Sequence, residues 1–134
     1  MSDSRHFFVA MDPPTATQQE KKIGVRNGKP FTYPDARWEQ AHNALWAALE
    51  PHRPSEPMRG AVVLEVVWCF PKRGHADGTP HTGKPDTDNL DKGLKDIMTA
   101  LGWWIDDAQV FSEHITKIHG RVPGIRIDIE EVKS

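Results

Sequence analysis

Carboxylates are concentrated in one short part of the chain, residues 86–107, which holds six aspartates and two lysines for a local formal charge of −4. Asp86 and Asp88 precede a helix-like run of apolar residues, and the adjacent pair Asp106 and Asp107 follows it. Oxygen ligands of this kind are those that Mg²⁺ and Mn²⁺ prefer. Without a cation or another compensating role, clustered carboxylates repel one another. The pattern therefore predicts a divalent-metal site.

The local chain geometry is expected to bring these carboxylates together. Pro85 disfavours helical backbone at Lys84, and in an extended chain residues i and i+2 point the same way, so the side chains of Asp86 and Asp88 can converge. A helix followed by a return strand is then expected to carry the pair Asp106–Asp107 back to the same edge of the sheet.

One lysine is placed to complete this chemistry. Lys92 lies one helical turn after Asp88 and therefore over the carboxylate cluster. In phosphodiester hydrolysis a metal activates water and neutralises charge on the phosphorus oxygens, while a lysine stabilises the developing oxyanion or holds the scissile phosphate. The segment favours this reaction.

Each acidic residue also has an ordinary structural explanation. Asp86 or Asp88 can cap the following helix, and Asp106–Asp107 can form a polar turn. Two pairs have the i,i+4 spacing of ion pairs on a helix surface, namely Asp88–Lys92 and Asp91–Lys95. Taken singly, each structural explanation is the stronger one, but together the six carboxylates favour a site.

A basic segment lies far from the acidic one in the sequence. Residues 21–37 carry a local charge of +4, from one acid, Asp35, and five bases, Lys21, Lys22, Arg26, Lys29 and Arg37. By composition alone a solvated loop explains them. The functional alternative is an arm that contacts phosphates.

The elements that must position these residues follow from the apolar pattern. We expect a strand over 5–11, a long loop over 12–33, a helix over 34–50, a buried strand over 61–70, a polar loop over 71–85 and a helix over 88–101. Two alternating segments, 110–119 and 125–130, are expected to pair as a hairpin through the turn at 120–124.

Length and composition limit the class of protein. The chain has 134 residues, 37% hydrophobic and 27% charged, which fits one globular domain over residues 1–134. A net charge of −2 argues against a uniformly basic nucleic-acid binder but leaves room for a basic patch. Cys69 is the only cysteine, so a disulfide-stapled fold is excluded. No signal region or membrane-length apolar run is visible, and we expect a cytoplasmic protein without a membrane partner.

Some residues carry weaker signals. Cys69, His75 and His81 are evenly spaced, but structural zinc usually recruits tighter ligand pairs, so solvated loop histidines are the preferred explanation. Trp103 and Trp104 offer stacking surfaces for an exposed base, although core packing is the better explanation for at least Trp104.

The motif over residues 84–110 resembles the RusA family of Holliday junction resolvases. The matching pattern is Lys84-Pro-Asp86-Thr-Asp88-Asn89-Leu90-x-Lys92, then Asp96, then Gly102-x-Trp104-x-Asp106-Asp107-x-Gln109-Val110. Weaker similarity covers most of the chain: an early Pro-Pro after a short strand, a basic loop and an aromatic-led first helix. The resemblance implies an α+β fold, a single small domain with a mixed β-sheet and two main helices, and a homodimer.

The resemblance also implies roles for particular residues. Asp86, Asp88 and Asp107 are expected to bind Mg²⁺, with Mn²⁺ as the other candidate, and Lys92 to be the catalytic lysine. Supporting roles are expected for Asp106 and Asn89. The residues expected to contact DNA are Lys21, Lys22, Arg26, Lys29, Lys72, Arg73 and Lys84.

The implied activity is Mg²⁺-dependent resolution of four-way DNA junctions by paired cleavage, in recombination and repair in a bacterial or phage-infected cell. Two symmetric cuts suit a C2 dimer, the commonest oligomer. One alternative is a non-catalytic binder of branched DNA, although a pure binder gains nothing from six acids near phosphates. Another is a nuclease that acts on flaps or forks.

Overall fold

A computed structural model of the chain describes residues 3–16, 21–34 and 36–132. Its strands are β1 (Asp3–Ala10), β2 (Lys21–Arg26), β3 (Lys29–Pro34), β4 (Ala61–Pro71), β5 (Val110–Gly120) and β6 (Gly124–Val132). Its helices are α1 (Ala36–Leu49) and α2 (Thr87–Ala100), with the short 3₁₀ turns η1 (Glu50–His52) and η2 (Asp107–Gln109). The fold is a small α+β domain with a mixed sheet and two helices, as predicted.

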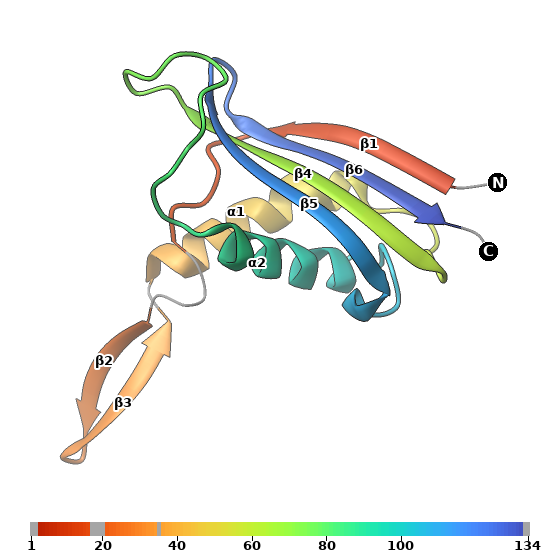
Figure 1. Cartoon of the computed structure of the whole chain (residues 1–134). Helices are drawn as coiled ribbons and strands as arrows, with labels where there is room; N and C mark the ends of the chain where they lie inside the picture. Colours follow the sequence, from red (N-terminus) through yellow and green to blue (C-terminus); the bar gives the residue numbers. More distant parts are fainter. Residues whose placement is uncertain (1–2, 17–20, 35, 133–134) are drawn as a thin grey trace.

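The main sheet has the strand order β1-β6-β4-β5 (Figure 1). β6 pairs antiparallel with both β1 and β4, whereas β4 pairs in parallel with β5. A parallel pair needs a long crossover, and α2 lies within it. Strands β1, β4 and β5 therefore end at the same edge of the sheet, and α2 begins at that edge.

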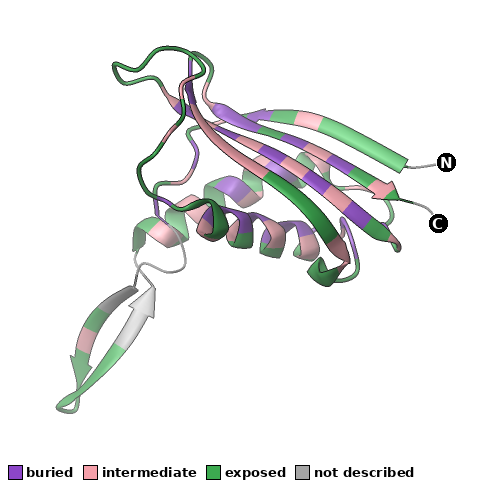
Figure 2. Cartoon of the chain, viewed as in Figure 1, coloured by how far each residue is buried: buried purple, intermediate pink, exposed green. Residues whose placement is uncertain are grey.

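The core lies between the sheet and the two helices, which cover one face (Figures 1 and 2). In β4 every second residue is buried, as expected for a strand with one covered face. These residues are Val62, Leu64, Val66, Trp68 and Phe70. Helix α2 buries Leu90, Leu94, Ile97 and Met98 against them. Gly102, at a φ of 88°, allows the turn that ends this helix, as the sequence predicted.

The predicted hairpin between the last two strands is wrong. β5 and β6 are not neighbours, because β4 lies between them and pairs with both. The short connection between Gly120 and Gly124 therefore passes over the end of β4 rather than forming a hairpin turn. Alternation along β5 and β6 identified them as strands but carried no information on which strand each would pair with.

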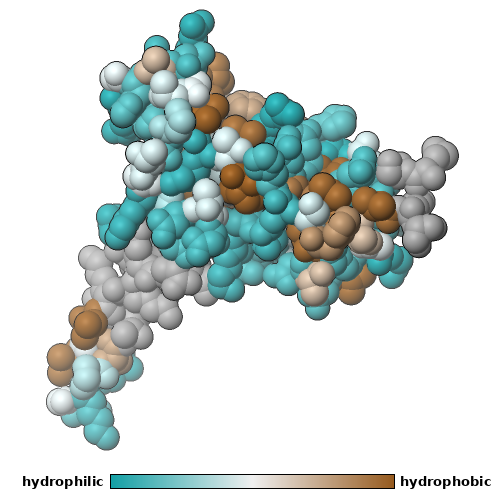
Figure 3. Space-filling model, in the orientation of Figure 1, coloured by the Kyte–Doolittle hydropathy of each residue, from teal (hydrophilic) through white to brown (hydrophobic). Residues whose placement is uncertain are grey.

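The predicted loop over 12–33 is also wrong in part, because residues 21–34 form the two-stranded hairpin β2–β3. Asn27 and Gly28, with φ of 51° and 76°, supply the positive angles of a tight hairpin turn. Figure 1 shows this hairpin projecting from the body, and Figure 3 shows apolar side chains exposed on it. Ile23 and Val25 are 75% and 72% exposed.

No helix in the described parts of the chain is long and apolar enough to cross a membrane.

Two glycines provide a matched test of this packing. A Cβ at Gly124 would overlap the ring of Phe8 and the carbonyl oxygen of Val9, so Gly124→Ala is expected to lower the free energy of unfolding by about 1–3 kcal/mol. A Cβ at Gly93, inside α2, would meet nothing within 4 Å, so Gly93→Ala is expected to raise it by roughly 0.5–1 kcal/mol. Urea denaturation measures both, and equal effects of the same sign would contradict the packing described for β1 and β6.

Candidate functional site

Asp86 and Asp88 present two free carboxylates at the first turn of α2. Asp86 occupies the N-cap position with extended backbone, at a φ of −69° and a ψ of 154°, yet its side chain makes no capping hydrogen bond. Both residues are exposed. The capping explanation therefore fails for Asp86, and the extended backbone predicted before the helix is present.

The chain segment that carries Asp86 is fixed from below by β5. The Nζ atom of Lys117 donates to the carbonyl oxygen of Pro85 at 2.7 Å and also to that of Gly83. On the helix side, the backbone N–H of Leu90 donates to the carbonyl of Asp86 at 3.1 Å, and Leu90 is buried. Sequence reasoning missed Lys117, because nothing in a strand residue indicates that it holds a distant turn.

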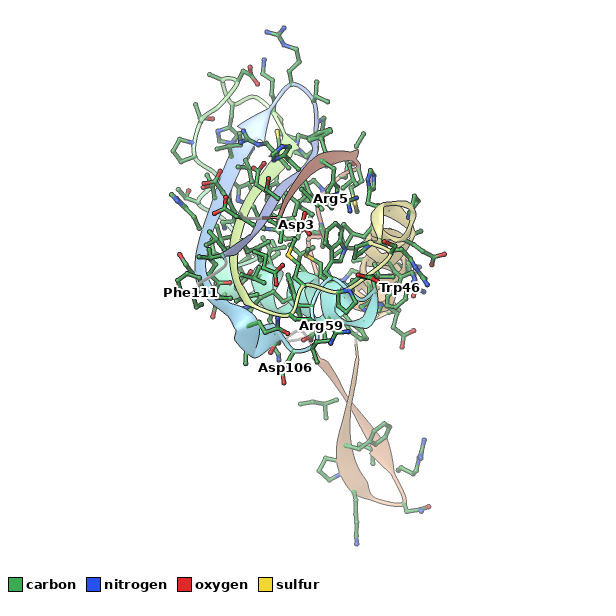
Figure 4. The ribbon with its side chains drawn as sticks, turned by 90° about the vertical axis from the view of Figure 1, so that its right-hand side faces the viewer. Asp3, Arg5, Trp46, Arg59, Asp106 and Phe111 are labelled. Carbon is green, nitrogen blue, oxygen red and sulfur yellow. The ribbon has the colours of Figure 1, made fainter. Side chains whose placement is uncertain are left out.

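Asp106 and Asp107 lie at the opposite end of α2. Asp106 accepts a hydrogen bond from the backbone N–H of Ala108 at 2.9 Å, and Gln109 accepts one from the N–H of Asp106, which makes a capping box. Gln109 also donates to the carbonyls of Met58 and Gly60, and Figure 4 shows Asp106 and Arg59 close together at this end of the body. Asp106 therefore shapes the turn, while the exposed Asp107 follows it.

The expected convergence of the two acidic motifs does not occur within one chain. Helix α2 has 14 residues, which correspond to about 20 Å, and it separates Asp86 and Asp88 from Asp107. The return strand β5 begins only at Val110, after the second motif, so it carries Lys117 rather than Asp107 back to the first. Among the described residues, no three His, Cys, Asp or Glu side chains are grouped so that they could hold a metal ion.

The lysines of α2 differ in their surroundings. Lys95 pairs with Asp91 at 3.3 Å, as the i,i+4 spacing predicted, and with Glu113 on β5 at 3.1 Å. Lys92 is exposed and makes no ion pair with Asp88 among the interactions of the described residues. The predicted catalytic lysine is therefore available at the surface, one turn after the carboxylate of Asp88.

Most of the predicted DNA-binding residues lie toward the Asp86 end of the molecule. Lys72, Arg73 and Lys84 are exposed in the loop between β4 and α2. The hairpin carries Arg26, whose guanidinium lies 5.1 Å from the ring of Phe31, and the exposed Lys29. For Lys21 and Lys22 the structure describes the backbone in β2, and the side chains lie outside the described parts.

The residues with weaker sequence signals pack against other side chains of the domain. Trp103 and Trp104 are both buried, which excludes them as stacking surfaces for a base. Asn89 is half-buried beside Leu90 and lines a small cavity with His42 and Trp68. In the described parts of the chain, His75, His81 and Cys69 are not grouped so that the three could hold one metal ion. The two histidines belong to a stack of aromatic rings at the end of the sheet.

The sequence profile of the family described as Endodeoxyribonuclease RusA matches residues 12–130. The chain belongs to the RusA family of endodeoxyribonucleases. A protein of Lactococcus phage r1t named crossover junction endodeoxyribonuclease rusA is 33% identical over 129 residues, which cover 94% of this chain and 97% of the phage protein. The uncharacterized protein YqaN of Bacillus subtilis (strain 168) is 26% identical over 139 residues, covering 95% and 96%.

Family membership confirms the resemblance predicted from residues 84–110 and makes this RusA-family chain a nuclease. The matched region contains both acidic motifs, Lys92, the hairpin and the loop between β4 and α2.

A buried carboxyl beside the acidic site has unusual electrostatics. Asp91 is only 5% exposed, and its Oδ1 atom has no hydrogen-bond partner. Burial, and then a hydrogen bond with Glu113, raise the pKa of Asp91 from 3.8 to about 6, although Lys95 acts in the opposite direction. Asp91 therefore keeps a proton over a pH range in which an exposed aspartate would release it.

The free energy of unfolding should therefore depend on this proton. Because the folded chain binds it more tightly than the unfolded chain, the contribution is present below about pH 4 and is lost as the pH rises through about 6. The difference between the ordinary and the raised pKa corresponds to roughly 3 kcal/mol in the free energy of unfolding. In Asp91→Asn the amide stays neutral, and we expect the decline in stability between pH 4 and 6 to shrink. Thermal unfolding across this range measures it, with Asp96→Asn, at an exposed position of the same helix, as the control. Parallel profiles for Asp91→Asn and the wild type would refute the raised pKa of Asp91.

Proposed function

We propose that this chain is a Mg²⁺-dependent, structure-specific endonuclease that resolves four-way DNA junctions as a homodimer, in recombination and repair. One observation carries the proposal: Asp86 and Asp88 are held at the start of α2, within the region matched by the nuclease family, and among the described residues neither carboxylate has a hydrogen-bond or ion-pair partner. The name of the phage r1t relative, a crossover junction endodeoxyribonuclease, supports the choice of substrate.

The residues present fit a divalent cation only if two copies contribute. Aspartate oxygens are suitable donors for Mg²⁺, and Asp86 and Asp88 offer two of them from one copy. Asp107 lies about 20 Å away in the same copy, at the far end of α2. The set that would hold the metal is therefore Asp86 and Asp88 with Asp107 of a second copy. When bound, the metal activates water and neutralises charge on the phosphate oxygens.

A two-fold symmetric dimer supplies such a set twice. Because an isologous interface places the same surface of each copy against the other, one α2 can lie antiparallel to its partner. The first acidic motif of each copy then faces the second motif of the other. This arrangement produces two equivalent sites, which suits two cuts on opposing strands.

The chain's own residues have distinct tasks in this proposal. Lys92 places an ammonium group one turn from the free carboxylates, where it can donate to an oxygen of the scissile phosphate. Lys117 fixes the backbone before Asp86 through Pro85. The bases of the hairpin and of the loop after β4 hold flanking phosphates and offset the negative field of the acidic motifs.

The acidic motifs also separate this proposal from its alternatives. A non-catalytic binder of branched DNA would be weakened by exposed carboxylates on its binding face. A nuclease for flaps or forks would use the same residues, and the comparison of cleavage rates on a four-way junction, a flap, a fork and linear duplex distinguishes these substrates.

Substitution of one acidic residue at a time tests the composite site. Asp88→Asn and Asp107→Asn are each expected to abolish strand cleavage in Mg²⁺ while leaving junction affinity within about threefold, since loss of a negative charge does not weaken phosphate attraction. When the two inactive variants are mixed and allowed to exchange subunits, cleavage should return, because each mixed dimer holds one site with both residues intact. Nicked junctions, rather than paired cuts, are the expected product.

The control mixture combines Asp88→Asn with Asp86→Asn, which lie in the same half of the site. Every site in that mixed dimer lacks one ligand, so no cleavage is expected. Strand cleavage by Asp88→Asn or by Asp107→Asn alone would overturn the metal assignment. Absence of cleavage by the mixture of Asp88→Asn with Asp107→Asn would show that the site is not shared between copies.

The salt dependence of binding tests the hairpin. Arg26→Ala with Lys29→Ala should weaken binding to branched and linear DNA alike, and each lost phosphate contact should reduce the log–log salt slope by about 0.9. A charge-matched control replaces two exposed arginines away from the hairpin, Arg53 and Arg126. Equal slopes for the two double variants, measured by fluorescence anisotropy, would show that the hairpin charges serve solubility only.

A further inference from the structure

A cleft of about 570 Å³ opens at the edge of the sheet where β1, β4 and β5 end. Its walls come from the chain after β1, the chain after β4 and the end of β5, and the residues that matter here are Asp12, Thr15, Phe70, Arg73, His81 and His119. The first helical turn of α2, with Asp86 and Asp88, lies at the same edge. Of these six residues, the function proposed above uses Arg73 alone.

Aromatic rings form a ladder at this cleft, in which Phe70 and His119 are buried and His81 is half-buried. The ring centroids of Phe70 and His81 are 4.1 Å apart, those of His81 and His119 are 4.7 Å apart, and those of His119 and His75 are 3.9 Å apart. His75 and His119 are stacked with only 9° between their planes. This geometry does not suit a shared metal ion, because stacked rings point their nitrogens along parallel planes rather than at one point.

One ring of the ladder has an unused polar atom. The Nδ1 atom of His81 is buried and has no hydrogen-bond partner, whereas Nδ1 of His119 contacts the carbonyl oxygen of Pro71 at 3.1 Å. Burial, and then the positive charge of Lys117, lower the pKa of His81, so its ring is neutral near pH 7. A neutral imidazole offers one donor and one acceptor.

The cleft is connected to the acidic site through a single residue. The backbone N–H of His81 donates to the carbonyl of Lys117 at 3.0 Å, and the side chain of Lys117 donates to the carbonyl of Pro85, which precedes Asp86. A DNA strand whose phosphate lies at Asp86 and Asp88 would therefore run along the same edge of the sheet as this cleft.

We propose that the cleft binds one unstacked nucleobase of the strand being cut, packed against the half-buried ring of His81, which Phe70 and His119 support from within, and recognised at its edge by Asp12, Thr15 and Arg73. Aromatic side chains stack on any base, whereas a carboxylate, a hydroxyl and a guanidinium distinguish the hydrogen-bonding edges of different bases. The cleft is then the part of the chain that gives cleavage a preference for one base at one position. This inference rests on the proposed action on DNA.

A thermodynamic cycle tests the contact without any cleavage. Junctions that lack the base at one nucleotide, taken in turn across the branch point, are bound in EDTA by the wild type and by His81→Ala. At one position, loss of the base should weaken wild-type binding on the order of tenfold and leave the affinity of His81→Ala unchanged. His114→Ala, at an exposed histidine on β5 outside the cleft, should behave as the wild type.

A second variant leaves the aromatic ladder intact, in case His81→Ala disturbs the loop. Asp12 is exposed at the rim, and Asp12→Asn replaces an acceptor by a group that also donates. Cleavage in Mg²⁺ of junctions with each of the four bases at the sensitive position should show a changed order of rates, on the order of tenfold for the base that donates to Asp12.

The outcomes separate this inference from the function on which it rests. The wild type could bind and cut junctions normally, with no base position at which His81→Ala changes the effect of base loss and no altered base preference in Asp12→Asn. That result would overturn the nucleobase cleft alone, and the aromatic ladder would then only hold the loop in place. Failure of the wild type to bind branched DNA would overturn the proposed function and the cleft together.

Discussion

The parallel pairing of β4 with β5 is the constraint on which the rest of the molecule depends. Two parallel strands that follow one another need a crossover, and here α2 runs back along the sheet between them. The start of α2 must then lie where β4 ends, and its end must lie where β5 begins. The ten-residue parallel register, from Val62 opposite Val110 to Pro71 opposite Gly120, therefore fixes the two acidic motifs at opposite ends of one helix.

The same topology places the first acidic motif and Lys92 at one edge of the sheet without burying their charges. Asp86, Asp88 and Lys92 are exposed, so each fold can form in water without paying the desolvation that an interior cluster would require. The buried apolar residues of β4 and α2 supply the packing that holds this edge, and the side chain of Lys117 donates from β5 to the carbonyl of Pro85. Asp91, on the buried side of α2, is the exception, and its burial raises the pKa of its carboxyl to about 6.

Local signals in the sequence predicted most elements, and their failures have physical reasons. The apolar steps of α2 and the stop at Gly102 needed no tertiary information, and neither did the Asp-x-Asp motif. The hairpin β2–β3 was missed although Asn27-Gly28 is a strong turn signal, because its polar, Lys-rich flanks resemble a loop. The order of strands in the sheet could not be predicted in this way. The alternation of apolar and polar residues in β5 and β6 does not show that β4 lies between them, and it does not show that Asp107 stays at the far end of α2.

The separation of the motifs also bears on why a small chain would divide a site between copies. A nuclease that must cut two strands in a concerted way gains from sites that exist only in the dimer, since a lone copy then cannot introduce an unpaired nick. In the proposed dimer, a helix about 20 Å long with two of the expected ligands at one end and the third at the other would have this property, because a two-fold axis across it would complete both sites in one association step. Asp106, which is used to build the turn through Ala108, holds its neighbour Asp107 outward, where a second copy would meet it.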